Sequence, residues 1–169
     1  MTESQTYFSL SREDKIDALE VAASKLGRPA DLLEKDIWVV WVLNALFDSE
    51  LGEYLVFKGG TSLSKVYKAI DRFSEDVDLT YDIRQIIPDL IEDPDDPYPP
   101  SRSQAQKWTE AVRGRLGEWV GLKVAPMLSV KAAALPAEIR VEGDKIYLDY
   151  DAVRSGSGYV RSSVLLEFG

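Results

Sequence analysis

One stretch of the sequence decides the fold: Phe57-Lys58-Gly59-Gly60-Thr61-Ser62, followed after a helix-length segment by Ser74-Glu75-Asp76-Val77-Asp78-Leu79. The apolar run Tyr54 to Phe57 predicts a strand before the glycines, and the alternation from Asp76 to Leu79 predicts a second strand. The segment between them has the spacing of a helix. The stretch therefore predicts a strand, a glycine turn, a helix and a second strand that carries two carboxylates.

The second strand places its two carboxylates together. Side chains alternate between the faces of a strand, so Asp76 and Asp78 project to one side while Val77 and Leu79 project to the other. Carboxylate oxygens are the ligands that Mg²⁺ prefers, with Mn²⁺ as an alternative. Asp-x-Asp alone is weak evidence, because this acidic chain contains that spacing three times. The compound pattern, in which the glycine turn precedes the carboxylates, is what predicts a metal site.

The glycine turn is suited to a phosphate. Without a Cβ, Gly59 and Gly60 let a phosphate approach the backbone closely. Thr61 or Ser62 then caps the predicted helix, whose N-terminal amides and dipole favour an anion. Lys65 follows one turn later, within reach of the same phosphate. This turn predicts a site for the phosphates of a nucleotide.

The compound pattern resembles the DNA polymerase β-like nucleotidyltransferases. Among these it looks most like the AbiEii abortive-infection toxins of type IV toxin–antitoxin systems, relatives of the MenT toxins, from Phe57 to Leu63 and from Arg72 to Leu79. The resemblance implies an α/β (α+β) fold in which helices flank a small mixed sheet. It also implies Mg²⁺-dependent transfer of a nucleoside monophosphate from an NTP to an acceptor hydroxyl, with release of pyrophosphate.

In the resembled family a later strand supplies a third carboxylate. By its context in an apolar run near the end of the chain, Glu167 resembles that residue, and Asp149 is the alternative. The expected catalytic and metal-binding residues are therefore Asp76, Asp78 and Glu167. The expected nucleotide-binding residues are Gly59, Gly60, Thr61, Ser62 and Lys65.

The resemblance further implies partners and a domain layout. The expected acceptor is RNA, tRNA in particular, or a nucleotide, and a cognate antitoxin is the expected protein partner. The alternatives are transfer to a small molecule or a protein, or a non-catalytic nucleotide-binding domain. We expect one nucleotidyltransferase domain over 1–169, with a helical part over 1–50 and a catalytic core over 54–169. The helical second half that AbiEii-like proteins carry is expected to be absent.

The composition excludes several kinds of metal site and catalytic base. The chain has 169 residues with 45% hydrophobic content, neither cysteine nor histidine, and a net charge of −9. Disulfides and thiolate or imidazole metal sites are therefore excluded, and a general base must be a carboxylate, a lysine or a tyrosine. The negative charge argues against a broad nucleic-acid surface but leaves local basic clusters open. The longest apolar stretch, Ile37 to Phe47, is too short to span a bilayer, and a cytoplasmic location is expected.

The segments before the glycine turn predict two helices. Ser11 is a candidate N-cap for a first helix that ends at Gly27, and Asp31 begins a second, strongly apolar helix through Phe47. The second helix is expected to pack behind the catalytic sheet. The segment Glu34-Lys35-Asp36 resembles an acidic and basic stretch upstream of the glycines in the AbiEii-like family, and we interpret these charges as structural.

The segments after Asp82 predict helices and then sheet. A short helix over Ile83 to Ile91 and a solvated acidic, proline-rich loop precede a helix from Ser101, which Pro126 is expected to interrupt. Strands over Glu138 to Glu142 and Lys145 to Tyr150 form a hairpin candidate about Gly143-Asp144. A last strand over Tyr159 to Phe168 is expected to place Glu167 beside the strand of Asp76 and Asp78.

Overall fold

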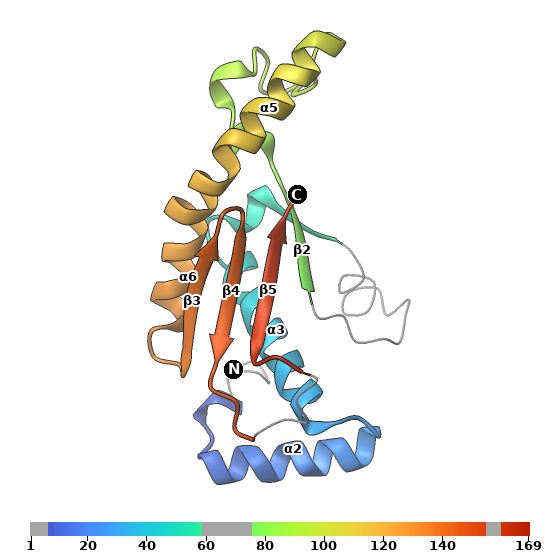
Figure 1. The fold of residues 1–169 in the computed structure, drawn as a ribbon, viewed down its shortest axis with the longest axis vertical. Coiled ribbons are helices and arrows are strands. Elements are labelled where there is room, and N and C mark those ends of the chain that lie inside the picture. The colour runs from blue at the N-terminus through green and yellow to red at the C-terminus, as the bar shows by residue number, and fades with distance from the viewer. Residues whose placement is uncertain (1–6, 59–75, 155–159) are drawn as a thin grey trace.

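The computed structural model describes residues 7–58, 76–154 and 160–169. Within these residues, five strands form one mixed sheet in the order β1-β2-β5-β4-β3. Figure 1 shows α3 behind the sheet, α5 and α6 along the side of β3, and α2 across the lower end. Helices therefore flank a small mixed sheet, as the sequence predicts.

The first helix, α2, spans Arg12–Leu26 and has the ends that its sequence predicts. The Asp14 backbone N–H donates to Ser11 Oγ at 3.1 Å, which satisfies one of the free amides of the first turn. Gly27 closes the helix with φ of 63°, a left-handed conformation that glycine adopts without a Cβ penalty. Both predicted caps are confirmed.

Helix α3, Ala30–Phe47, is the helix that supports the sheet. Trp38, Val42 and Leu46 are almost completely buried. The Trp38 ring stacks on Tyr150 with the ring centroids 5.2 Å apart, which joins the helix to the sheet. The predicted packing of this helix behind the sheet is confirmed.

The strands combine antiparallel pairs with a parallel one. Strand β1 pairs antiparallel with β2, and β5 pairs antiparallel with β4, which in turn pairs antiparallel with β3. In contrast, β2 and β5 run parallel. The strand bounds are Leu55–Lys58 for β1, Asp76–Tyr81 for β2, Ala137–Glu142 for β3, Lys145–Tyr150 for β4 and Ser163–Phe168 for β5.

The predicted hairpin between β3 and β4 is confirmed, and its turn explains the register. Gly143 has φ of 62° at the turn, and Glu142 pairs with Lys145 on either side of it. A two-residue turn of this kind needs positive φ, which glycine supplies. The predicted strand from Tyr159 is too long, because β5 begins at Ser163 and the described residues before it are not in a strand.

The connection after β2 also differs from the prediction. The sequence predicts a short helix over Ile83 to Ile91, but this segment forms two separate 3₁₀ turns, η2 at Ile83–Gln85 and η3 at Pro88–Leu90. Pro88 has no backbone N–H and disfavours a helical conformation at the residue before it, so one continuous helix cannot run through this segment. A further 3₁₀ turn, η1 at Gly52–Tyr54, leads into β1.

The long helical segment from Ser101 is not interrupted at Pro126, contrary to the prediction. Helix α5, Arg102–Trp119, continues through a π-helical turn, η4 at Val120–Val124, into α6, Ala125–Ala132. Pro126 lies in the first turn of α6. There the wider π-helical turn lets the chain accommodate a residue that lacks an N–H and whose ring would clash in a regular helix interior.

The sheet has one buried face and one open face. On the buried face, side chains from β2, β4 and β5 join the helices in a single hydrophobic core: Val77, Leu79, Ile146, Leu148, Val164 and Leu166. The residues that alternate with them are half-buried or exposed. Within the described ranges, the open face is therefore the part of the sheet that is available to a ligand.

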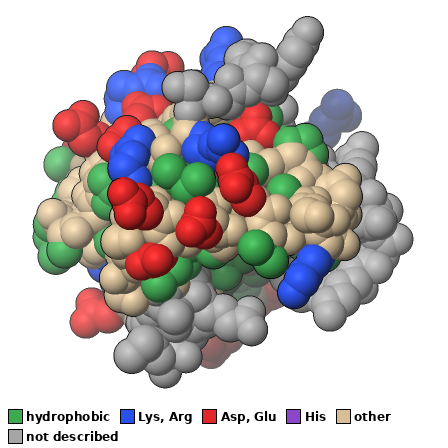
Figure 2. All heavy atoms as spheres, turned by 90° about the horizontal axis from the view of Figure 1, so that it is seen from below, with side chains coloured by type: hydrophobic (Ala, Val, Ile, Leu, Met, Phe, Trp, Pro, Cys, Tyr) green, Lys and Arg blue, Asp and Glu red, His purple; other side chains and the backbone are tan. Residues whose placement is uncertain are grey.

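Two further observations concern the surface of the described residues. No helix among them is long and apolar enough to cross a membrane. Figure 2 shows the face over α2, where acidic and basic side chains are interspersed over the described residues. On this face the described basic side chains do not gather into the broad patch that extended nucleic-acid binding would need.

Candidate functional site

A row of four charged side chains crosses the open face of the sheet. Lys58 of β1 pairs with Asp78 of β2, Asp78 pairs with Glu167 of β5, and Glu167 pairs with Lys145 of β4. Direct register partners project to the same face of a sheet, with Cβ atoms about 5 Å apart. The fold thus brings Asp78 and Glu167 side by side, although they are far apart in the sequence.

Asp76 lies one pleat along β2 from Asp78 on the same face. Its register partner is Leu165, and Val77 between the two aspartates is fully buried on the other face. Residues two apart on a strand are separated by about 7 Å. The predicted alternation is confirmed, and its cause is the burial of Val77 and Leu79 in the core.

Glu167 occupies the position beside β2 that the sequence predicts for it. Its carboxylate accepts a hydrogen bond from Lys145 Nζ at 2.6 Å, and both side chains are more than a third exposed. This hydrogen bond raises the pKa of Lys145 above its ordinary value. Lys145 therefore keeps its charge and holds the Glu167 carboxylate on the open face.

Asp149, the alternative third carboxylate, belongs to a different part of the open face. It pairs with Ser163, two pleats along β5 from Glu167, and accepts from Arg140 Nε at 2.8 Å. The hydrogen bond from Arg140 lowers the pKa of Asp149. Because Glu167 is the direct neighbour of Asp78, the geometry favours Glu167 over Asp149.

Lys58 is the last residue of β1. Its Nζ donates to the backbone carbonyl of Gly169 at 2.6 Å, and the Thr80 hydroxyl donates to the same oxygen at 2.7 Å. These two hydrogen bonds link β1 and β2 to the residue that follows β5. Lys58 thereby adds a positive charge beside Asp78 at the edge of the sheet.

The donor set fits a hard divalent cation, although it is spread along the sheet. Among the described residues, no group of three or more carboxylates is already gathered around one point that could hold a metal ion. The open face does offer the carboxylates of Asp76, Asp78 and Glu167 on two neighbouring strands. Carboxylate oxygens are the donors that suit Mg²⁺ or Mn²⁺.

The predicted nucleotide-binding residues lie outside the described part of the chain. These residues are Gly59, Gly60, Thr61, Ser62 and Lys65. They follow directly on Lys58, whose strand is described, and precede Asp76. Their role in binding a nucleotide stays a prediction.

A cavity of about 290 Å³ opens on the same face of the sheet, beside Asp76. Its walls come from α3, β2, β3, β4, β5 and the segment before β5. The lining residues are Lys35, Asp76, Arg140, Tyr147, Asp149, Arg161, Ser163 and Leu165. Apart from Asp76 and Asp149, none of these was predicted from the sequence as a site residue.

Lys35 is the lining residue that comes from α3. We expected the charges of Glu34-Lys35-Asp36 to be structural, and Glu34 fits that interpretation: its carboxylate accepts from the Val153 backbone N–H at 3.1 Å, and burial raises its pKa. Lys35 is 2% exposed but lines the cavity. A buried cation needs a polar partner, and Lys35 does interact with another residue, so its interpretation as a structural charge stays a prediction.

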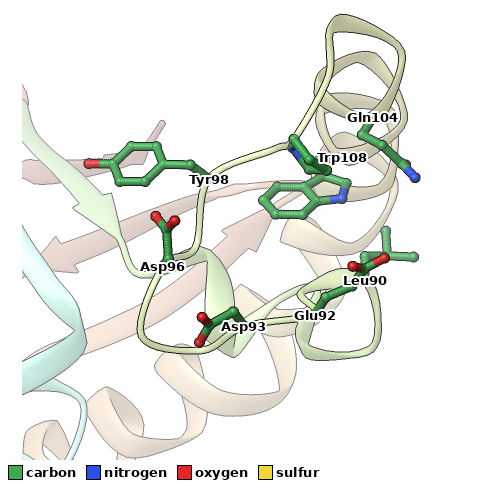
Figure 3. Close-up of a pocket in the computed structure, with 8 residues that line it drawn as sticks. Leu90, Glu92, Asp93, Asp96, Tyr98, Gln104 and Trp108 are labelled. Atoms are coloured by element: carbon green, nitrogen blue, oxygen red, sulfur yellow. The ribbon is translucent and has the colours of Figure 1, made fainter.

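A second cavity, of about 160 Å³, lies between the acidic loop and α5. Figure 3 shows the Trp108 ring pointing from α5 toward the loop that carries Glu92, Asp93 and Asp96, while Tyr98 projects away from the helix. All three carboxylates are exposed, so the prediction that this loop is solvated is confirmed. It shares no residue with the row on the sheet.

Comparison with known proteins supplies one match. The family model described as "Nucleotidyl transferase AbiEii toxin, Type IV TA system" matches residues 41–169. No curated protein and no solved structure matches the chain. The matched region contains β1 to β5 and the whole charged row, whereas Lys35 precedes it.

Proposed function

This chain belongs to the family of AbiEii nucleotidyltransferase toxins of type IV toxin–antitoxin systems, and from this we propose that it transfers a nucleoside monophosphate from an NTP to an acceptor hydroxyl through the carboxylates on the open face of its sheet. The proposal assigns the reacting site to Asp76, Asp78 and Glu167. The acceptor is a nucleotide or the end of an RNA, and the cognate antitoxin is the expected protein partner. We propose that the reaction takes place in the cytoplasm.

One observation carries this assignment: Asp78 and Glu167 are direct register partners in the parallel pair of β2 and β5. Like charges directly opposite one another destabilise a sheet. Part of that cost is offset by the flanking cations, since Lys58 pairs with Asp78 and Lys145 binds Glu167. A divalent cation would offset the remainder, which gives a physical reason for two carboxylates to occupy this position.

The metal would be held by Asp76, Asp78 and Glu167. When bound, Mg²⁺ supplies neutralisation of the triphosphate charge and lowers the pKa of a coordinated hydroxyl. Gly59, Gly60, Thr61 and Ser62 are proposed to bind the triphosphate through the turn and the helix N-terminus, with Lys65 as a charge partner. These residue roles are proposals.

The reaction is an in-line displacement. The acceptor oxygen forms a bond to the α-phosphorus while the bond between that phosphorus and the bridging oxygen to the β-phosphorus breaks, so pyrophosphate leaves. The acceptor proton passes to the Glu167 carboxylate, which faces the same side as Asp78. Positioning and electrostatic stabilisation carry most of the catalysis in phosphoryl transfer, and the rigid pairing of β2 with β5 supplies the positioning.

Calorimetric titration with each NTP tests the proposal. The parent chain should bind one or more NTPs in the presence of Mg²⁺ or Mn²⁺, and Asp78→Asn should abolish the metal-dependent part. Binding that is equal in EDTA and in Mg²⁺, or equal in the parent and in Asp78→Asn, contradicts the assignment. Pyrophosphate release measured with RNA, protein and aminoglycoside acceptors then identifies the class of acceptor.

A further inference from the structure

The cavity beside Asp76 has the composition of an anion-binding site. Three of its lining residues are cationic, Lys35, Arg140 and Arg161, and two are anionic, Asp76 and Asp149. Asp149 is already paired with Arg140 through the hydrogen bond at 2.8 Å. If a metal ion at the reacting site neutralises the charge of Asp76, the cavity keeps an excess of positive charge.

The two arginines of the cavity differ in how many side chains they already contact. Arg140 binds Asp149, forms an ion pair with Glu142, and lies over the Tyr147 ring at 4.2 Å from its centroid. Arg161, in contrast, is exposed at the cavity and forms no hydrogen bond or ion pair with any residue in 7–58, 76–154 or 160–169. Its guanidinium is therefore available to a ligand.

The walls also offer a buried hydroxyl and an apolar surface. The Ser163 hydroxyl is shielded from solvent and close enough to Asp149 to help lower the pKa of that carboxyl, but it lacks the geometry of a hydrogen bond to any described residue. Tyr147 and Leu165 are register partners on the same face. The cavity thus combines cations and a hydroxyl donor with the apolar surface of Tyr147 and Leu165.

We propose that this cavity binds the phosphate and the attached sugar of a nucleotide acceptor, with Arg161, Lys35 and Ser163 holding the phosphate. A planar guanidinium can donate two hydrogen bonds to one phosphate, and an ammonium adds a point charge. Tyr147 and Leu165 provide the surface for the sugar. This inference rests on the proposed function, because Asp76 would connect the cavity to the reacting site and direct the acceptor hydroxyl toward it.

The proposal discriminates between classes of acceptor. An aminoglycoside carries several ammonium groups, which Arg161 and Lys35 would repel. A nucleotide carries a phosphate and a free hydroxyl on the same sugar. The geometry therefore favours a nucleotide, alone or at the end of a nucleic-acid chain, over a cationic small molecule.

A nucleoside monophosphate is the appropriate probe. Calorimetric titration of the whole chain with 5′-AMP and 5′-CMP in EDTA should show binding, whereas adenosine and cytidine, which lack the phosphate, should bind at least about tenfold more weakly. Equal affinity for the monophosphate and the nucleoside would overturn the proposal. EDTA keeps the measurement independent of the proposed metal site.

Variants locate the bound probe. Arg161→Ala should weaken 5′-AMP binding about ten- to a hundredfold, because charged hydrogen bonds to the phosphate are lost. Arg113→Ala, which removes an exposed arginine from α5, is the matched control and should bind like the parent. Lys35→Met should also weaken binding. Because Lys35 is buried, its replacement also affects the stability of the fold, so the variant of the exposed Arg161 is the decisive one. Unchanged affinity in Arg161→Ala, or affinity that depends on Lys65 instead, would overturn the proposal.

The failure of this inference can be told apart from the failure of the proposed function. Asp78→Asn should abolish metal-dependent NTP binding and leave 5′-AMP binding in EDTA unchanged. Binding of 5′-AMP that requires Arg161 in a chain that binds no NTP would support the cavity and contradict the proposed reaction. Metal-dependent NTP binding without any binding of 5′-AMP would contradict the cavity alone.

Discussion

Asp78 of β2 and Glu167 of β5 lie directly opposite one another in a parallel strand pair, and their carboxylates share the open face of the sheet. The burial of Val77 and Leu166, which are also register partners, fixes this arrangement from the opposite face. A slip of one residue in either strand would turn a carboxylate toward the core. The packing of the core therefore keeps the two acidic side chains next to one another.

The first prediction concerns the two aspartates of β2. Asp76→Asn and Asp78→Asn should each lower the rate of nucleotide transfer about a hundredfold or more, because each removes a charge that would stabilise the metal. Both side chains face the open side of the sheet, so the melting temperature should stay close to that of the parent. Pyrophosphate release and thermal unfolding measure the two effects. Asp96→Asn, in the exposed acidic loop, is the control and should remain fully active.

The second prediction concerns the ion pair between Lys145 and Glu167. Lys145→Gln removes the cation that binds the Glu167 carboxylate at 2.6 Å. The freed carboxylate should raise the Mg²⁺ affinity, by about fivefold at most, because an exposed pair of this kind is weak. Calorimetric titration with Mg²⁺ measures the change. A weaker Mg²⁺ affinity in Lys145→Gln would show that Lys145 positions Glu167 rather than competing for it.

The third prediction concerns Glu34 and its dependence on pH. Glu34→Ala leaves the buried Val153 N–H without its acceptor and should lower the free energy of unfolding by about 1–3 kcal/mol. Burial raises the pKa of Glu34 in the folded state. The stabilisation linked to its protonation is therefore fully present below the unfolded-state pKa, about 4.3, and is lost as the pH rises through the folded-state pKa.

The parent and Glu34→Ala should consequently differ more at pH 4 than at pH 7. Urea unfolding at the two pH values measures the difference. Glu20→Ala, which removes an exposed carboxylate paired with Arg154, is the control and should show a smaller loss of stability. A difference between the parent and Glu34→Ala that shrinks as the pH falls would show that the buried carboxyl is favoured in its charged form.

The fourth prediction concerns the contact between α3 and the sheet. Trp38 is 2% exposed and stacks on Tyr150 of β4. Trp38→Ala should lower the free energy of unfolding by about 3–5 kcal/mol, because it leaves a large cavity between the helix and the sheet. Leu122→Ala, at a residue that is 66% exposed, should change it by no more than about 0.5 kcal/mol. Urea unfolding followed by circular dichroism measures both.

The sequence predicted those features that depend on local patterns. The alternation in β2 identified the faces of Asp76 and Asp78, because a period of two is visible in the residues themselves. Ser11, Gly27 and Gly143 predicted the ends of a helix and a hairpin turn, because their conformational preferences act locally. The position of Glu167 beside β2 followed from the family resemblance, and the sheet confirms it.

Features that depend on tertiary packing could not be predicted. Whether Lys35 faces solvent or the cavity depends on how α3 is rotated against the sheet, which the sequence pattern of the helix does not determine. The pairing of Asp149 with Arg140 depends on the register of β3 and β4. The continuation of the helix through Pro126 required a π-helical turn, and no sequence pattern indicated that turn in advance.

The parallel pairing of β2 with β5 has a consequence for the order of folding. Asp78 and Glu167 are separated by 89 positions in the sequence, and the hairpin of β3 and β4 lies between them. Pairing across such a separation carries a loop-closure cost and tends to form late. The two carboxylates should therefore meet only when the sheet is nearly complete, so that a partly folded chain, during its synthesis or after damage, would be unable to assemble the proposed reacting site.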